Sequence, residues 1–175
     1  MSEQDPRAVT ENDSADLATR LVEQLRDRGL TIATAESLTA GLVSAGIADV
    51  PGASAVLRGG AATYATPTKA AVLGVDADLL RERGAVDADV ALEMAHGAVR
   101  LFAADLAVAT TGVAGPAIQD GQDVGTCYVA VAFSGESSGE RGRCHVDRFQ
   151  FVGDRAEIRR AAAWAAWQMA LDHTR

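Results

Sequence analysis

The sequence predicts an α/β fold: a three-layer α/β/α sandwich with a mixed, mainly parallel sheet, built as a single domain. Apolar residues recur at helical spacing in some segments and form short runs in others, and the two kinds of segment alternate. Two late strand patterns separated by a turn-forming segment predict a hairpin, which makes the sheet mixed. The 175 residues, 48% of them hydrophobic, suffice for one core.

The first half of the chain is predicted to alternate helices with strands. Residues 1–13 have little to bury, so we expect a disordered tail followed by one domain over 14–175. The expected elements are a helix over 14–28, a strand over 30–35, a helix over 36–50, a strand over 56–65, and short helices over 69–73 and 78–83. The paired glycines of the second strand indicate a bulge or a close backbone approach.

The second half is predicted to hold the remaining strands between two longer helices. The expected elements are a helix over 86–104, a strand over 105–111, a glycine-rich loop over 112–125, strands over 126–135 and 143–153, and a helix over 154–171. Asp87 is the expected N-cap of the first of these helices. The two late strands form the expected antiparallel pair.

Net charge limits the classes of partner. A formal charge of −8 and a pI near 4.8 argue against a phosphate backbone as the main ligand, so we expect no nucleic-acid partner. The acidic balance and the scarcity of lysine match proteins that work in concentrated salt, whereas a codon bias favouring alanine, arginine, glycine and aspartate is the simpler alternative. The N-terminus is polar and acidic and no apolar run could span a bilayer, so we expect a cytoplasmic protein without membrane contact.

The cysteines predict no metal site. Cys127 and Cys144 lie in separate apolar strands without the spacing of metal ligands, so we expect buried free thiols and neither a disulfide nor a metal centre.

Strand-to-helix turns are where sites gather in such folds, which directs attention to Ser37. Its position at the end of a predicted strand favours a helix-capping role. The alternative is a nucleophile whose hydroxyl lies near exposed N–H groups and the positive end of a helix dipole. A nucleophilic serine needs a base, and none of the three histidines is well placed to supply one.

Lys69 is the single lysine beside fifteen arginines. A neutral lysine can serve as the base if desolvation or a neighbouring cation lowers its pKa from about 10.4. Arginine cannot, because the guanidinium stays protonated. Composition alone favours a surface lysine at least as much. Tyr64 nearby is either an ordinary half-buried aromatic residue or a partner of the lysine amine or of a substrate ring.

Two further segments have the composition of ligand sites. The segment TTGVAGP, residues 110–116, suits close approach of backbone amides to an anion or sugar, although a plain glycine turn is the simpler interpretation. Arg155 and Arg159 lie four apart at the start of the last helix, where surface positions are the default and phosphate binding is the alternative.

Several short segments, taken in their order along the chain, resemble motifs of the CinA C-terminal-domain family. TAESLTAG resembles its AESCTGG signature, GASAVLRGGAATYATPTK resembles GSSAxFxGGxVTYSNxAK, and LGV, GAVDADVALEMA, TGVAGP, VGT and FxGDRxxIR follow in the family's order. The match runs from about Leu17 to Leu171. Single-domain members resemble nicotinamide-nucleotide amidohydrolases, which convert nicotinamide mononucleotide to nicotinic acid mononucleotide and ammonia.

The resemblance implies roles for particular residues. Ser37 matches the nucleophile, Lys69 the general base and Tyr64 the tyrosine of the same segment, in an acyl-enzyme mechanism without a metal or cofactor. The implied substrate-binding residues are Glu36, Thr39, Thr111, Gly112, Gly115 and either Arg155 or Arg159. The resemblance also makes a homodimer or higher homo-oligomer the expected assembly.

The sequence departs from the family pattern at several positions. Leu38 replaces the family's cysteine, Ala40 replaces its first glycine, Pro67 is added, and residues 117–123 lack the family's lysine. Leu38, Ala40 and the altered loop motivate an alternative function, a non-catalytic nucleotide-binding or regulatory module. A role as partner of another protein, for instance in a DNA-damage response, rests only on the family's name.

Overall fold

The computed structural model describes residues 11–135 and 141–175, and within these ranges it contains six α-helices, one short 3₁₀ helix and five strands. The helices are α1 (Glu11–Arg28), α2 (Leu42–Ala48), α3 (Thr66–Leu73), α4 (Ala77–Arg83), α5 (Ala88–Phe102) and α6 (Arg155–His173). The strands are β1 (Ile32–Glu36), β2 (Leu57–Ala62), β3 (Leu106–Gly112), β4 (Thr126–Ser134) and β5 (Arg141–Gln150). The 3₁₀ helix is Ala53–Ala55.

The strands form one mixed sheet in the order β2-β1-β3-β4-β5. β1 pairs parallel with both β2 and β3, whereas β4 pairs antiparallel with β3 and β5. Only β4 therefore runs against the other described strands. The predicted sheet and the late hairpin are confirmed, although most of the predicted turn between β4 and β5 lies outside the described residues.

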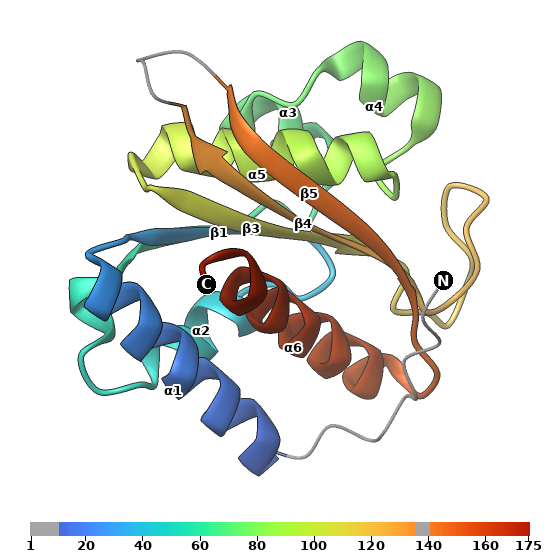
Figure 1. Ribbon diagram of the computed structural model, residues 1–175. Coiled ribbons are helices and arrows are strands. Elements are labelled where there is room, and N and C mark those ends of the chain that lie inside the picture. The colour runs from blue at the N-terminus through green and yellow to red at the C-terminus, as the bar shows by residue number, and fades with distance from the viewer. Residues whose placement is uncertain (1–10, 136–140) are drawn as a thin grey trace.

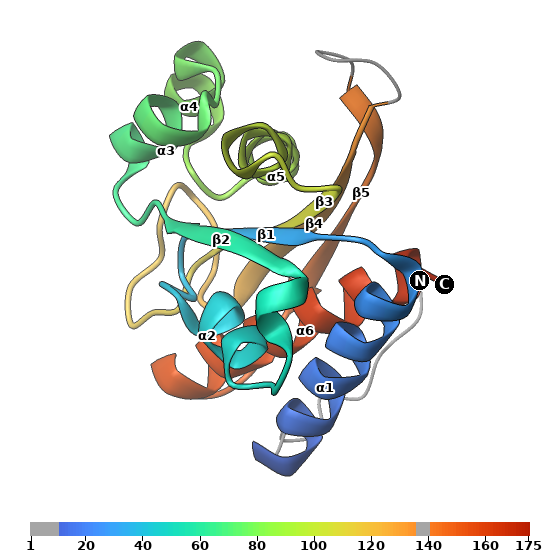
Figure 2. The same ribbon diagram turned by 90° about the vertical axis from the view of Figure 1, so that its left-hand side faces the viewer.

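The helices cover both faces of the sheet. Helices α1, α2 and α6 lie on one face and α3, α4 and α5 on the other (Figure 1), and the view turned by 90° shows the three layers end-on (Figure 2). Each face has its own buried apolar cluster, which fits the predicted three-layer sandwich. No helix within 11–135 and 141–175 is both long and apolar enough to cross a membrane.

Helix boundaries follow local chemistry. Asp87 caps α5 as predicted, its carboxylate accepting from the N–H of Asp89 at 2.8 Å. At α6, Asp154 and Glu157 form a reciprocal capping box. α1 begins at Glu11, earlier than predicted, and ends where Gly29 adopts a positive φ of 65°. Of the predicted tail over 1–13, residues 1–10 lie outside the described residues and 11–13 belong to α1.

Two glycines permit close approaches that the fold requires. A Cβ at Gly60 in β2 would lie 2.4 Å from Thr34 Oγ1, and a Cβ at Gly97 in α5 would lie 2.2 Å from the carbonyl oxygen of Leu73 in α3. β2 also has an irregular register opposite Ile32 and Ala33, as the paired glycines predicted. Gly97 therefore lets α3 pack directly against α5.

The cysteine prediction was half right. Cys127 in β4 is a buried free thiol, and burial raises its pKa. Cys144 is free but exposed, because β5 is an edge strand.

Candidate active site

The site lies where the carboxyl ends of parallel strands meet. Ser37 directly follows β1, and Thr63 and Tyr64 directly follow β2. Two backbone bonds join these ends: Ser37 N–H donates to Thr110 O in β3 at 2.9 Å, and Thr63 N–H donates to Glu36 O at 2.9 Å. Helix α3 then brings Lys69 back over this edge. Segments far apart in the sequence thus meet at one end of the sheet.

Ser37 and Lys69 are in direct contact. Lys69 Nζ lies 3.0 Å from Ser37 Oγ and donates to the carbonyl oxygen of Thr63 at 2.7 Å. The Lys69 side chain is fully buried, and Ser37 is 9% exposed. The geometry joins a hydroxyl and an amine within hydrogen-bonding reach, at a position sheltered from bulk water.

Burial changes the acidity of Lys69. Desolvation lowers the pKa of its ammonium group from 10.5 to about 8, against a smaller opposing effect from the negative charge of Asp120. At pH 7 about a tenth of Lys69 is therefore uncharged, and at pH 8 about half. An uncharged amine 3.0 Å from a serine hydroxyl can accept its proton.

The sequence of α3 explains how Lys69 is held. Pro67 lies in the first turn, where its missing N–H costs no helical bond and its fixed φ suits the helix. Gly74 ends the helix at a φ of 69°, donating to Ala70 O at 3.0 Å. The added proline is thus compatible with the position of Lys69.

The prediction that Ser37 caps a helix is wrong. α2 begins at Leu42, and the intervening residues form a turn. The buried carboxylate of Glu36 instead closes the helix start. Glu36 accepts four hydrogen bonds, from Thr34 Oγ1 at 3.0 Å and from the N–H groups of Gly41 at 2.8 Å, Val43 at 3.0 Å and Ser44 at 2.9 Å. The start of α2 therefore does not stabilise charge at Ser37, because Glu36 already occupies it.

Tyr64 and Arg155 form a bridge at the mouth of the site. Arg155 donates to the hydroxyl of Tyr64 and, at 2.7 Å, to the carbonyl oxygen of Gly115. Tyr64 is 54% exposed, and its backbone carbonyl, not its hydroxyl, lies 3.5 Å from Lys69 Nζ. This bridge brings together three of the predicted site residues.

The remaining predicted residues are placed around the turn and the glycine loop. Thr39 Oγ1 lies 2.7 Å from Thr110 Oγ1, both fully buried. Thr111 Oγ1 donates to Ala85 O at 2.6 Å, and Gly112 ends β3. Arg159 donates from Nε to Leu38 O at 2.8 Å and from Nη2 to Thr39 O at 2.9 Å. Thr39 and Arg159 thus hold the turn after Ser37, whereas Thr111 joins β3 to the segment before α5.

Three contributors were not predicted in their present roles, although Thr110 begins the segment over 110–116 that the sequence singled out. Thr63 supplies the carbonyl that accepts from Lys69, and Thr110 ties the Ser37 turn to β3. Asp120, in the altered loop, accepts from Ala85 N–H at 2.8 Å and influences the Lys69 pKa. Thr63 could have been inferred from its place beside Tyr64. The contacts of Thr110 and Asp120 depend on tertiary packing, which no local pattern reveals.

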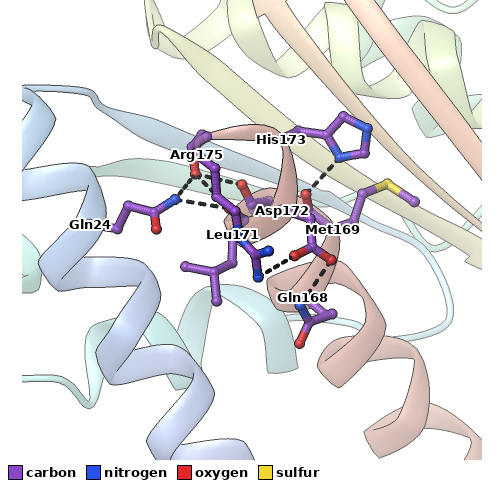
Figure 3. A network of polar contacts seen from close by, with 9 residues as sticks. Gln24, Gln168, Met169, Leu171, Asp172, His173 and Arg175 are labelled. Atoms are coloured by element: carbon purple, nitrogen blue, oxygen red, sulfur yellow. Dashed lines mark hydrogen bonds and ion pairs between the residues drawn. The ribbon is translucent and has the colours of Figure 1, made fainter.

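A second polar cluster lies at the opposite end of α6 and lacks these properties. Figure 3 shows its residues around the end of the helix, with Gln24 reaching across from α1. Gln24 donates to Leu171 O at 2.9 Å, Gln168 to Asp172 at 2.9 Å, and Arg175 pairs with Asp172 at 2.8 Å (Figure 3). We call this the C-terminal network. Beside it lies an open depression of about 440 Å³, lined by charged residues of both signs including Arg20 and Asp27.

No group of three or more histidine, cysteine, aspartate or glutamate side chains in the described ranges is placed to hold a metal ion.

Fold and site together define a three-layer α/β protein with a buried serine–lysine pair at the carboxyl edge of its parallel strands. Residues 14–174 match the CinA C-terminal domain, and the chain belongs to this family. The family resemblance that the motifs predicted is thereby confirmed.

Named relatives agree with this assignment. The chain is 43% identical over 159 residues to a CinA-like protein of Geobacter sulfurreducens, covering 90% of this chain and 37% of that protein. It is 42% identical over 148 residues to a putative competence-damage inducible protein of Desulforamulus reducens, covering 85% and 34%. The chain thus spans about a third of the length of the curated relatives it matches.

Solved structures match over nearly their whole length. The competence/damage inducible protein CihA of Agrobacterium tumefaciens is 35% identical with a TM-score of 0.83, over 91% of this chain and 96% of that one. A CinA superfamily protein of Klebsiella pneumoniae is 31% identical with a TM-score of 0.85, over 92% and 97%.

Proposed function

We propose that this protein is a nicotinamide-nucleotide amidohydrolase that converts nicotinamide mononucleotide to nicotinic acid mononucleotide and ammonia. The observation that carries the proposal is the buried contact of 3.0 Å between Lys69 Nζ and Ser37 Oγ. A serine beside a lysine of lowered pKa has the chemistry of an activated nucleophile and its base. The substrate is inferred from the family resemblance.

The proposed reaction begins with attack by Ser37 on the carboxamide carbon. The Oγ–carbon bond forms while the hydroxyl proton moves to Lys69 Nζ, and the carbonyl electron pair moves onto oxygen. When the tetrahedral species collapses, the carbon–nitrogen bond breaks and Lys69 returns the proton to the departing ammonia. Water then attacks the acyl-enzyme with Lys69 again as the base, which releases the acid and restores Ser37.

The mouth of the site suits the two ends of such a substrate. Tyr64 offers an exposed aromatic ring for stacking on a pyridine, and Arg155 offers an exposed cation for a phosphate. Arg155 now donates to Tyr64 and to Gly115, so phosphate binding would exchange at least one of these bonds.

Ammonia release from nicotinamide mononucleotide tests the proposal, measured across a range of salt concentrations. We expect Ser37→Ala and Lys69→Ala to reduce turnover by about 10³-fold or more. Lys69→Arg should be equally inactive, because it keeps the charge but cannot accept a proton. Absence of ammonia release by wild-type protein at every salt concentration, or full activity of Ser37→Ala, would refute the proposal.

A second candidate function is favoured by the backbone at Ala40. This residue has a φ of 50°, in the left-handed region, where the family pattern has glycine. A strained turn beside Ser37 fits a module that binds the nucleotide without turning it over. Thermal stabilisation by nicotinamide mononucleotide without ammonia release would support this alternative.

A further inference from the structure

The turn that follows Ser37 leaves two backbone donors unused. Four amides are bonded: Ser37 N–H to Thr110 O, Ala40 N–H to Ser37 O, Gly41 N–H to Glu36 Oε2, and Leu42 N–H to Thr39 O. The N–H groups of Leu38 and Thr39 have no acceptor in the described part of the chain. Both residues are buried, at 3% and 0% exposure. Buried unpaired N–H groups are rare in proteins, and a pair beside a nucleophile can receive an oxyanion.

Arg159 holds the peptide that carries one of these two donors, the N–H of Thr39. Its guanidinium donates to Leu38 O at 2.8 Å and to Thr39 O at 2.9 Å, so one planar group holds two successive carbonyls. In a trans peptide the C=O and the following N–H point in opposite directions. Holding Leu38 O toward α6 therefore directs the N–H of Thr39 away from α6.

The opposite side of the turn is tied to β3. Thr39 Oγ1 lies 2.7 Å from Thr110 Oγ1, and Ser37 N–H donates to Thr110 O at 2.9 Å. The peptide between Leu38 and Thr39 is thus held from α6 by its carbonyl and from β3 through its neighbours. Without Arg159 the carbonyl would lose its partner and the peptide could rotate.

Arg159 differs in this respect from Arg155, the first residue of α6. Arg155 is exposed, lies at the mouth and bridges Tyr64 to Gly115. Arg159 is half-buried and donates only to backbone carbonyls of the Ser37 turn in the described ranges. The two arginines, equivalent candidates for phosphate in the sequence, therefore occupy different environments.

We propose that Arg159 is a positioning residue, which fixes the Leu38–Thr39 peptide so that its N–H donates to the oxyanion formed when Ser37 attacks. The inference rests on the proposed function, since it assumes acyl transfer at Ser37. It assigns Arg155, and not Arg159, to the phosphate end of the substrate.

Two readouts separate positioning from substrate binding. In Arg159→Lys, which keeps the charge but loses the planar fork, we expect kcat for nicotinamide mononucleotide to fall about tenfold or more, with KM changed by less than about twofold. Labelling of Ser37 by a small fluorophosphonate, which carries no nucleotide, should slow by a similar factor. Arg160→Lys, an exposed neighbour on α6, is the matched control and should change neither.

Arg155→Lys provides the contrast, with an expected rise in KM and an unchanged labelling rate. Should Arg159→Lys fail to fold, Arg159→Ala with added methylguanidinium replaces it, and recovery of labelling is expected. A raised KM with normal kcat and normal labelling in Arg159→Lys would overturn the inference and make Arg159 a phosphate ligand.

The labelling arm also separates this inference from the proposed function. The wild-type protein could be labelled at Ser37, with slower labelling in Arg159→Lys, and yet not hydrolyse nicotinamide mononucleotide. That result would support the positioning role of Arg159 and reject nicotinamide mononucleotide as the substrate. Wild-type protein that is not labelled at Ser37 even at pH 9 rejects both.

Discussion

The molecule has two polar clusters that differ in burial more than in the number of their contacts. Around Ser37 and Lys69 the side chains are buried, and their partners are largely backbone groups from several elements. The C-terminal network has well-formed bonds too, but Asp172 and Arg175 have 43% and 64% of their side chains exposed. Its contacts are local to the ends of α1 and α6 (Figure 3).

The difference shows which polar contacts can alter chemistry. In the buried cluster, desolvation lowers the Lys69 pKa to about 8, so its proton affinity suits catalysis near neutral pH. Exposed charges exchange protein partners for water at little cost, and such ion pairs contribute about 0–1 kcal/mol. Neither the density of hydrogen bonds nor the open depression beside the C-terminal network therefore marks the functional site.

The largest expected effect concerns stability and pH at Lys69. Its pKa is about 8 in the folded protein and 10.5 in the unfolded chain, so between these values the unfolded chain holds one more proton. Folded stability should therefore rise with pH over this window, by about 3 kcal/mol relative to Lys69→Met. Urea unfolding of both proteins at several pH values between 7 and 10.5 measures the difference.

Arg160→Met serves as control, because an exposed arginine should not alter the pH dependence. Parallel curves for wild type and Lys69→Met would show that Lys69 is ordinarily solvated, and the contrast between the two clusters would fail.

The next effect is on rate. Turnover should rise about tenfold per pH unit below pH 8 and level off above it, because only neutral Lys69 accepts the serine proton. Asp120→Asn should move the midpoint to lower pH, since the Asp120 charge raises the Lys69 pKa. The asparagine oxygen can still accept from Ala85 N–H, so the loop contact is retained. A midpoint that moves to higher pH would contradict this electrostatic role.

A smaller effect is expected at the turn itself. Ala40→Gly should stabilise the protein by about 1 kcal/mol, because it relieves a left-handed φ of 50° in a residue with a Cβ. Ala45→Gly, the same change at an exposed helical position in α2, should destabilise it by about as much. Both variants are compared by the change in their free energy of unfolding in denaturant. If Ala40→Gly destabilises the protein as Ala45→Gly does, the backbone at Ala40 is not strained.

The smallest effect is expected in the C-terminal network. Asp172→Asn removes the ion pair with Arg175 but should change the free energy of unfolding by less than about 0.5 kcal/mol and leave ammonia release unchanged. A loss above about 2 kcal/mol, or any loss of activity, would show that exposure is a poor guide here.

Much of the fold could be predicted because local patterns decide it. The helix over Asp87 and the late hairpin follow from apolar periodicity, caps and turn residues. The start of α2 could not, because the capping group is the Glu36 carboxylate, which precedes the helix by several residues. The prediction that Cys144 is buried was wrong because β5 is an edge strand. The order of strands in a sheet cannot be inferred from a local sequence pattern.

The Ser37–Lys69 pair was predicted through a combination of residue chemistry and family resemblance. Lysine, unlike arginine, can act as a base after burial, yet only the fold shows that Lys69 is buried against Ser37. The separate environments of Arg155 and Arg159 were beyond prediction. Both lie on the same helix face in the sequence pattern, and only the path of the Ser37 turn distinguishes them.

The absent side chain at Gly97 makes the distance between Ser37 and Lys69 depend on a residue outside the site. The carbonyl oxygen of Leu73 lies 2.2 Å from the position that a Cβ at Gly97 would take, and Leu73 is one helical turn beyond Lys69. The methyl group of Gly97→Ala would push α3 away from α5. Because Lys69 lies in α3, its Nζ would move relative to Ser37 Oγ. The distance between Lys69 Nζ and Ser37 Oγ therefore depends on how closely α3 and α5 pack within one layer, and we expect a substitution at Gly97 to lower turnover without contacting Ser37.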